Sequence, residues 1–170
     1  MHLGALRDAR NGDSMPAMSA VKQPMTSLYD SDFVGWTQQQ AEALRSRRLE
    51  RLDYDNLIEE IESMGKQQQA ELTNRLAVLL AHLLKWQYHP GARALHGRSW
   101  RLTAKEQRLQ LARHLRKNPS LRPVIPEAMD DAWREAVVSA ARDSGLDESA
   151  YPAQCPYGFE QATTLDWMPD

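Results

Sequence analysis

Five cationic side chains recur along one predicted helix with a spacing that brings them to one face. At 100° per residue they fall within an arc of roughly 80°, and they are Arg98, Arg101, Lys105, Arg108 and Arg116. A row of cations beside a buried helix face suits a phosphate backbone, with Trp86 or Trp100 available for stacking if exposed. The alternative is a solvated face, or cations paired with acidic neighbours. We favour the alternative, because one basic helix in a chain of net charge −2 is a weak indication of nucleic-acid binding.

Three carboxylates form an opposing acidic stripe. Asp55, Glu59 and Glu62 stand at i, i+4 and i+7, so they share one face of a helix. Such a row can bind a divalent cation or place a general acid beside a base. However, the Glu-x-x-His words of helical metal sites and the His/Cys spacings of zinc sites are absent from the sequence. We therefore favour a solvated or salt-bridged acidic face, and expect no metal and no cofactor.

The two stripes also suggest a pairing. We expect some of the carboxylates at 55–62 to face cations between Arg101 and Arg108 across a helical bundle. Exposed pairs of this kind contribute only about 0–1 kcal/mol each, so they would select neighbours more than they would stabilise the fold.

Two further side chains have chemical potential. His82 has Val78 and Trp86 one turn to either side. It suits a ligand, a general base working with Glu59 or Glu62, or a core histidine bonded to a carbonyl or carboxylate. Cys155 suits a nucleophile or a small packed residue. We favour the structural interpretation of both, since the sequence also lacks a Gly-x-Ser-x-Gly elbow and the glycine words of nucleotide-binding loops.

The elements that must position these residues are helices. Apolar residues make up 42% of the 170 residues and charged residues 26%, values typical of a globular chain. Residues 1–26 have no helical or strand period and are predicted to be a disordered tail, with Met18 or Met25 as the natural start. Residues 27–170 are predicted to form a single helical domain, because no stretch alternates as a strand does.

The predicted helices follow the period of 3.6 residues. The first begins near Asp30 or Ser31 as its cap. The second covers 53–64, with a kink or break at Met64-Gly65, and its apolar face is formed by Tyr54, Leu57, Ile58, Ile61 and Met64. A central apolar helix covers 66–88 and ends at His89-Pro90-Gly91. A turn to Gly97, a basic helix at 98–117 and a helix at 123–144 capped by Gly145 follow. The fold class is therefore all-α: a helical bundle of about four to five helices with an irregular C-terminal strap, in which Trp167 clamps back onto the bundle.

Several long sequence words in this order resemble the bacterial family catalogued as domain of unknown function 29. They are LYDSDFVGWTQQQAEALR at 28–45, LDYDNLIEEIESMGK at 52–66, LAVLLAHLLKWQYHP at 76–90, RSWRLTAKEQR at 98–108, NPSLRP at 118–123 and YPAQCPYGFEQATTLDWMPD at 151–170. The resemblance implies a mainly helical fold and a bacterial source. It brings no catalytic residues, because none is established for the family.

These patterns favour a non-catalytic helical interaction or accessory protein whose partner is another protein. Nucleic-acid binding by the basic helix is the first alternative, and an enzyme using the carboxylates of helix 53–64 with His82 is the second. The sequence is also compatible with a homo-oligomer. No apolar run approaches the roughly 18 residues that cross a bilayer, so no membrane partner is expected. The single cysteine and the lack of an apolar leader favour the cytoplasm.

Overall fold

The computed structural model describes residues 27–170, and the predicted tail at 1–26 lies outside the described residues. All regular elements in the described range are helical, as the sequence predicted. Contacts divide the chain into two compact units, with the boundary between Asp53 and Tyr54. The range 27–170, predicted as a single domain, contains parts of both units, and each unit has its own packing. The units are therefore described separately.

The first unit is built around Trp36. It contains α1 (Leu28–Ser31), α2 (Phe33–Arg45) and the short 3-10 helix η1 (Leu49–Arg51). The buried Trp36 indole donates from Nε1 to the Asp53 carboxylate over 3.1 Å, and the Asp53 amide donates to the buried Gln40 side chain over 2.8 Å. These two hydrogen bonds hold Asp53, the last residue of the unit, against α2.

The start of α2 differs from the prediction. Asp32, and neither Asp30 nor Ser31, caps this helix, because its carboxylate accepts from the Gly35 amide over 2.9 Å. The preceding turn is the separate helix α1, which Ser27 caps. Two adjacent caps thus divide what the sequence suggested was one helix start.

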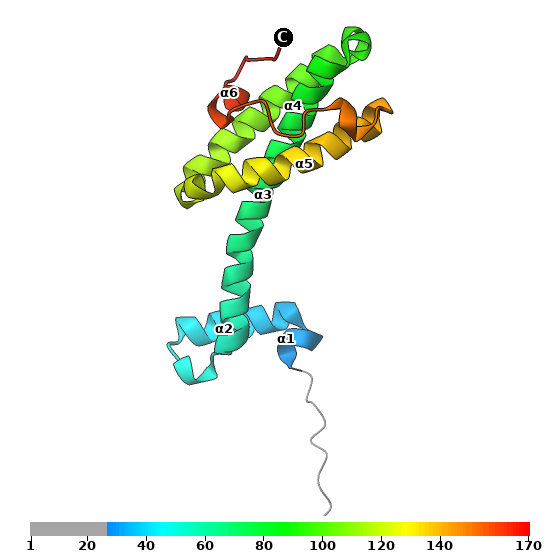
Figure 1. Cartoon of the computed structure of the whole chain (residues 1–170). Coiled ribbons are helices and arrows are strands. Elements are labelled where there is room, and N and C mark those ends of the chain that lie inside the picture. Colours follow the sequence, from blue (N-terminus) through cyan, green and yellow to red (C-terminus); the bar gives the residue numbers. More distant parts are fainter. Residues whose placement is uncertain (1–26) are drawn as a thin grey trace, which may run out of the picture. The chain divides into compact units, whose positions relative to one another are not determined.

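The second unit is organised along one long helix, α3 (Tyr54–Tyr88). The sequence predicted a kink or a break at Gly65, and the break is wrong, since α3 runs through this position without interruption. Its second half lies in the core, and the completely buried core residues that α3 contributes are Leu72, Leu76, Leu79, Leu80, Leu83 and Leu84. Figure 1 shows that the other long helices cover this half of α3 and leave its first half projecting beyond them.

Two helices pack along the second half of α3. They are α4 (Pro90–Lys117) and α5 (Ile125–Ser144), separated by the 3-10 helix η2 (Pro119–Val124). Pro90 occupies the first turn of α4, where its missing amide hydrogen is not needed, so the turn predicted for 91–97 is helical instead. Ala132, Ala136 and Ala140 are completely buried on α5, and their small side chains let α5 approach α3 closely. Gly145 ends α5 with φ +73°, as predicted.

The C-terminal strap is pinned to this bundle. After η3 (Glu148–Ala150), the Pro152 carbonyl accepts from the buried Trp133 indole over 3.2 Å. The short helix α6 (Phe159–Thr163) follows. The Trp167 ring meets the buried Tyr157 ring edge-on at 5.5 Å and packs against the core, which confirms the predicted clamp.

The glycine within α3 gives a direct stability prediction. A Cβ at position 65 would meet no atom within 4 Å, so Gly65→Ala should stabilise the protein by about 0.5–1 kcal/mol through reduced backbone entropy of the unfolded chain. Thermal unfolding followed by circular dichroism measures the change. Gly97→Ala is the matched control, because its Cβ would lie 3.1 Å from both the Arg93 and Trp86 side chains. A lower melting temperature for Gly65→Ala would contradict the account.

Candidate functional site

The first half of α3 presents an exposed apolar stripe. Ile58, Ile61 and Met64 lie at helical spacing and are 55, 66 and 63% exposed. The sequence predicted them on one apolar face of a helix, and this face stays uncovered by the other helices of the unit, which reach only the second half of α3. The α4 C-terminus shows where the coverage ends: the His114 ring donates to the Gln68 carbonyl over 2.9 Å. We call Ile58, Ile61 and Met64 the α3 stripe.

The predicted acidic stripe flanks this apolar surface. Asp55, Glu59 and Glu62 are all exposed, and within the part of the chain that the structure describes none of them forms an ion pair. The carboxylates therefore rim one side of the α3 stripe. Because Glu59 and Glu62 fall just after Asp55 on the same unbroken helix, their mutual placement is fixed by α3 itself.

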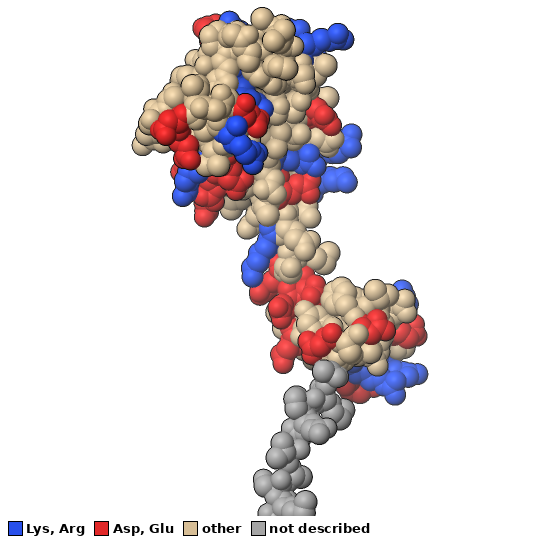
Figure 2. Space-filling model, turned by 90° about the vertical axis from the view of Figure 1, so that its right-hand side faces the viewer, with Lys and Arg blue, Asp and Glu red and all other residues tan. Residues whose placement is uncertain are grey.

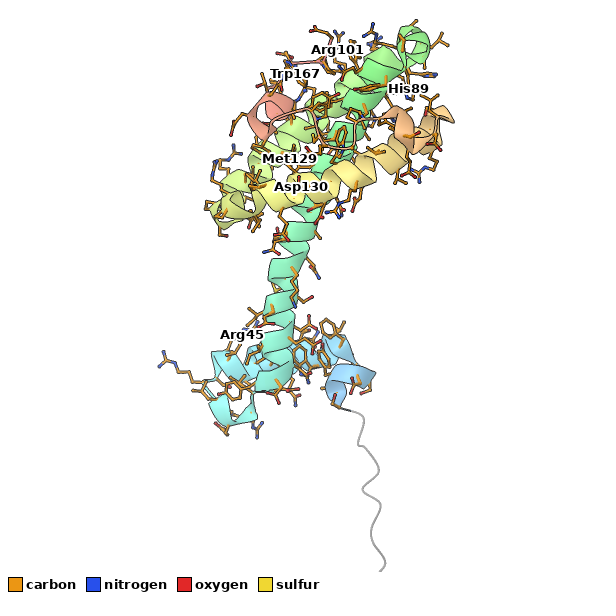
Figure 3. All side chains as sticks on the ribbon, in the orientation of Figure 1. Arg45, His89, Arg101, Met129, Asp130 and Trp167 are labelled. Carbon is orange, nitrogen blue, oxygen red and sulfur yellow. The ribbon has the colours of Figure 1, made fainter. Side chains whose placement is uncertain are left out.

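The predicted basic stripe on α4 divides into three kinds of side chain. Arg98, Arg101 and Arg116 are exposed and form no ion pair among residues 27–170; Figure 3 shows Arg101 on the outer side of α4. Lys105 instead pairs with Asp166 of the strap, with 3.1 Å between Nζ and Oδ1. We call Arg98, Arg101 and Arg116 the α4 cations.

Arg108 corrects the prediction for the basic stripe. It is only 3% exposed, and its guanidinium donates to the carbonyls of Ala162, Leu165 and Trp167 over 2.8, 3.0 and 2.6 Å. Burial lowers the pKa of the Arg108 guanidinium from its usual value. The side chain is thus the internal support of the strap and cannot contact a nucleic acid at the surface.

The predicted pairing of the two stripes is also wrong. α3 and α4 run antiparallel from the tight link at His89, and the last turn of α4 lies beside Gln68. The carboxylates at 55–62 therefore lie beyond the reach of Arg101 and Arg108. In the region that the structure describes, both sets of charges are available for contacts with other molecules, apart from the Lys105 and Arg108 partners given above.

The helix α4 also carries a row of exposed apolar side chains that the sequence analysis above did not identify as a candidate site. Leu95, Leu102 and Leu109 recur every seven residues and are 82, 56 and 56% exposed. Their spacing is a usable signal, but the turn predicted for 91–97 placed Leu95 outside the helix. We call these residues the α4 stripe.

Figure 2 shows that acidic and basic side chains are both exposed on the face it displays.

His82 lies too far from Glu59 and Glu62 for the acid–base role that the sequence offered as an alternative. Glu62 and His82 stand twenty positions apart in one unbroken helix, which separates them by about 30 Å at 1.5 Å per residue. The His82 ring instead donates from Nδ1 to the Val78 carbonyl over 2.8 Å, as predicted for a structural histidine. Direct proton transfer between these groups is therefore ruled out.

The surroundings of His82 make stability depend on pH. Burial lowers the pKa of its imidazole below the usual 6.5, and the Lys85 ammonium acts in the same direction, against the Val78 bond and the Asp143 carboxylate. Just below pH 6.5 the unfolded chain therefore binds more protons than the folded chain. The free energy of unfolding does not depend on the ionisation of His82 above this pH, and it decreases as the pH falls through 6.5. Burial lowers the pKa of His89 as well, with the same sign. Urea unfolding at successive pH values should show this loss, and His82→Gln should reduce it; an unchanged pH dependence in the variant would contradict the role of His82.

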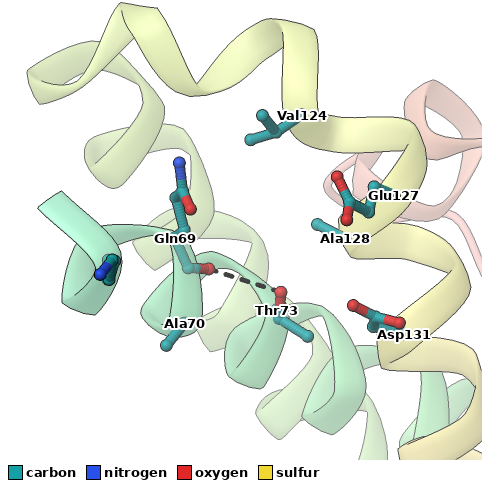
Figure 4. A pocket seen from close by; sticks show the side chains of 8 residues that line it. Gln69, Ala70, Thr73, Val124, Glu127, Ala128 and Asp131 are labelled. Atoms are coloured by element: carbon teal, nitrogen blue, oxygen red, sulfur yellow. Dashed lines mark hydrogen bonds between the residues drawn. The ribbon is translucent and has the colours of Figure 1, made fainter.

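A small hollow lies between α3 and α5. Its volume is about 210 Å³, and Figure 4 shows Glu127 and Asp131 on one wall with Gln69 and Thr73 on the other. The hollow is open, and the dashed bond in it joins only Thr73 to the Gln69 carbonyl within α3. No group of three or more metal-binding side chains occurs among the residues that the structure describes.

Cys155 is half-buried, and its thiol donates to the Tyr157 carbonyl over 3.4 Å. Burial raises the pKa of this thiol, which disfavours the reactive thiolate. The observation agrees with the packed alternative that the sequence favoured.

A comparison with models of known protein families identifies a match over most of the described residues. A family model described as Domain of unknown function DUF29 matches residues 28–168. No curated protein and no solved structure matches the chain. None of the helices between residues 27 and 170 combines the length and hydropathy needed for a membrane span.

Proposed function

The chain belongs to the DUF29 family, and from that premise we propose that it is a non-catalytic interaction protein that binds a partner protein through the first half of α3. One observation carries the proposal: Ile58, Ile61 and Met64 stay more than half exposed on a regular helix. Contiguous exposed apolar side chains with a polar rim are typical of protein interaction sites. Helical spacing of the anchors suits a partner that packs lengthwise against the helix.

The acidic stripe narrows the chemistry of that partner. Asp55, Glu59 and Glu62 rim the α3 stripe on one side, so a partner that combines apolar anchors with flanking cations fits both features. Opposite charges at the rim favour encounter and register, while the apolar centre provides most of the binding energy. We place this interaction in the bacterial cytoplasm, where a lone cysteine such as Cys155 stays reduced.

The test is a comparison between tagged copies purified from the native host with nuclease present. The wild-type protein should retain a stoichiometric partner, identified by mass spectrometry, and Ile58→Ser with Ile61→Ser should lose it. The control is Val138→Ser with Leu146→Ser, which removes exposed apolar side chains elsewhere and should keep the partner. Equal retention by the α3 variant would reject the α3 stripe as the contact.

Nucleic-acid binding by α4 is a second candidate, supported by the exposure and lack of ion pairs of Arg98, Arg101 and Arg116 in the described residues. It predicts that affinity for labelled duplex DNA or single-stranded RNA falls steeply as salt increases, measured by fluorescence anisotropy. Arg101→Glu with Arg116→Glu should abolish it. Arg108 is unsuitable for this test, because its substitution would release the strap. Absent or salt-insensitive binding would reject this candidate.

A further inference from the structure

The α3 stripe and the α4 stripe are both apolar, and the charged residues that flank them have opposite signs. The α3 stripe is rimmed by the acidic stripe, and the α4 stripe (Leu95, Leu102 and Leu109) is rimmed by the α4 cations. Each helix therefore offers what the other lacks. Within one chain they cannot meet, since α3 is continuous and α4 ends beside Gln68. A second copy of the chain supplies the missing surface.

We propose that the protein pairs with a second copy of itself, with the α3 stripe of each copy against the α4 stripe of the other. This inference rests on the proposed function, because it names the partner of the same α3 surface. Burying three apolar side chains from each helix gives the contact its centre. Carboxylates of one copy beside cations of the other give its rim, the arrangement that sets partner and orientation in paired helices.

The order of charges around each helix selects the direction of pairing. Viewed from the helix N-terminus at about 100° per residue, the carboxylates lie clockwise of the α3 stripe. The α4 cations lie anticlockwise of the α4 stripe. When two helices face each other in parallel, the clockwise flank of one lies beside the anticlockwise flank of the other, as in parallel coiled coils. Parallel packing therefore brings Glu59 and Glu62 beside Arg98 and Arg101, whereas antiparallel packing separates them.

A two-fold dimer satisfies this requirement. Within one copy α3 and α4 are antiparallel, as the contact between His114 and Gln68 requires. A two-fold axis perpendicular to these helices reverses both directions, so α4 of the second copy runs parallel to α3 of the first. The same operation forms the reciprocal contact, and the interface closes after two copies. Using both contacts also brings the buried area closer to the ~1,200–2,000 Å² of stable interfaces than a single stripe pair would.

Charge reversal tests the inference on the purified full chain by analytical ultracentrifugation. The wild type should form dimers that weaken as salt increases. Glu59→Arg with Glu62→Arg makes both facing flanks positive, and Arg98→Glu with Arg101→Glu makes both negative. Each variant alone should dissociate at least about tenfold more readily than the wild type. Mixed in equal amounts, they should form a heterodimer, because both reciprocal contacts then pair opposite charges.

The controls separate pairing from folding and from the proposed function. Arg122→Glu with Glu148→Arg reverses exposed charges outside the stripes and should leave dimerisation unchanged, and circular dichroism should be equal in all variants. A monomeric wild type at every concentration, or variants that fail to rescue each other on mixing, would overturn the self-pairing. If the native-host experiment still showed a partner lost with Ile58→Ser and Ile61→Ser, the α3 stripe would keep its role with a different protein. If the variant with Ile58→Ser and Ile61→Ser kept both the partner and the dimer, both proposals would be rejected.

Discussion

Replacing Arg108 with alanine is expected to lower the free energy of unfolding by about 3–4 kcal/mol. The guanidinium is buried and donates to three strap carbonyls, those of Ala162, Leu165 and Trp167. Its removal leaves these acceptors without their donor and opens a cavity beneath the strap. Urea unfolding at neutral pH measures the loss.

Two controls give this prediction its specificity. Arg101→Ala removes an exposed cation from the same helix and should change the free energy of unfolding by no more than about 0.5 kcal/mol. Arg108→Lys should recover little, because an ammonium cannot reach three carbonyls with the fixed geometry of a guanidinium. Hydrogen exchange should accelerate first in residues 157–168 of Arg108→Ala. Equal losses for Arg101→Ala and Arg108→Ala would contradict the account of the strap.

Arg108 also illustrates how far a sequence pattern extends. The helical period placed it in the same arc as Arg101 and Lys105, and this geometric prediction is sound. The strap that covers it lies 54 positions or more along the chain. Periodicity describes one helix at a time, so it cannot predict which part of a polar face another segment will bury.

The helices themselves were largely predictable, and the errors have local causes. Gly65 suggested a kink or a break, but α3 is unbroken there, because the cost of about 1 kcal/mol for a glycine is small beside the cooperativity of a long helix. Pro90 was correctly taken to end one helix, although proline is equally suited to start the next. Together these two positions hid the full lengths of α3 and α4. The central apolar helix predicted for 66–88 lies within α3, and its leucines from Leu72 onward are buried.

The candidate interaction surface was predictable only in part. The residue types and spacings of the acidic stripe and of the α3 stripe were apparent from the sequence. Whether Ile58, Ile61 and Met64 face a core or water depends on where α4 and α5 end along α3. That register is set by contacts such as the one between His114 and Gln68, 46 positions apart, which no local pattern contains.

Removing the carboxylate from the half-buried ion pair of Lys85 and Asp143 is expected to cost more than removing the cation. Lys85 is only 7% exposed, with its Nζ 2.8 Å from Asp143 Oδ2, whereas the Asp143 side chain is 43% exposed. Asp143→Ala leaves a buried ammonium without its partner and should lower the free energy of unfolding by about 2–3 kcal/mol. Lys85→Met leaves a carboxylate that water can solvate and adds a buried apolar side chain, so its effect should lie within about 1 kcal/mol of zero.

A double-mutant cycle in urea completes this prediction. The chain with both substitutions should be more stable than Asp143→Ala alone, because no charge then lies buried without a partner. The Lys85 bond also holds the pKa of the Asp143 carboxyl below its usual 3.8, so the wild-type pair contributes fully above that pH. Its contribution is lost as the pH falls through the lowered value, and Lys85→Met should not show this loss. A larger cost for Lys85→Met than for Asp143→Ala would contradict this account. It would mean that the Lys85 ammonium stabilises the fold mainly through a contact other than Asp143, such as the Trp100 ring, whose centroid lies 5.9 Å from Nζ.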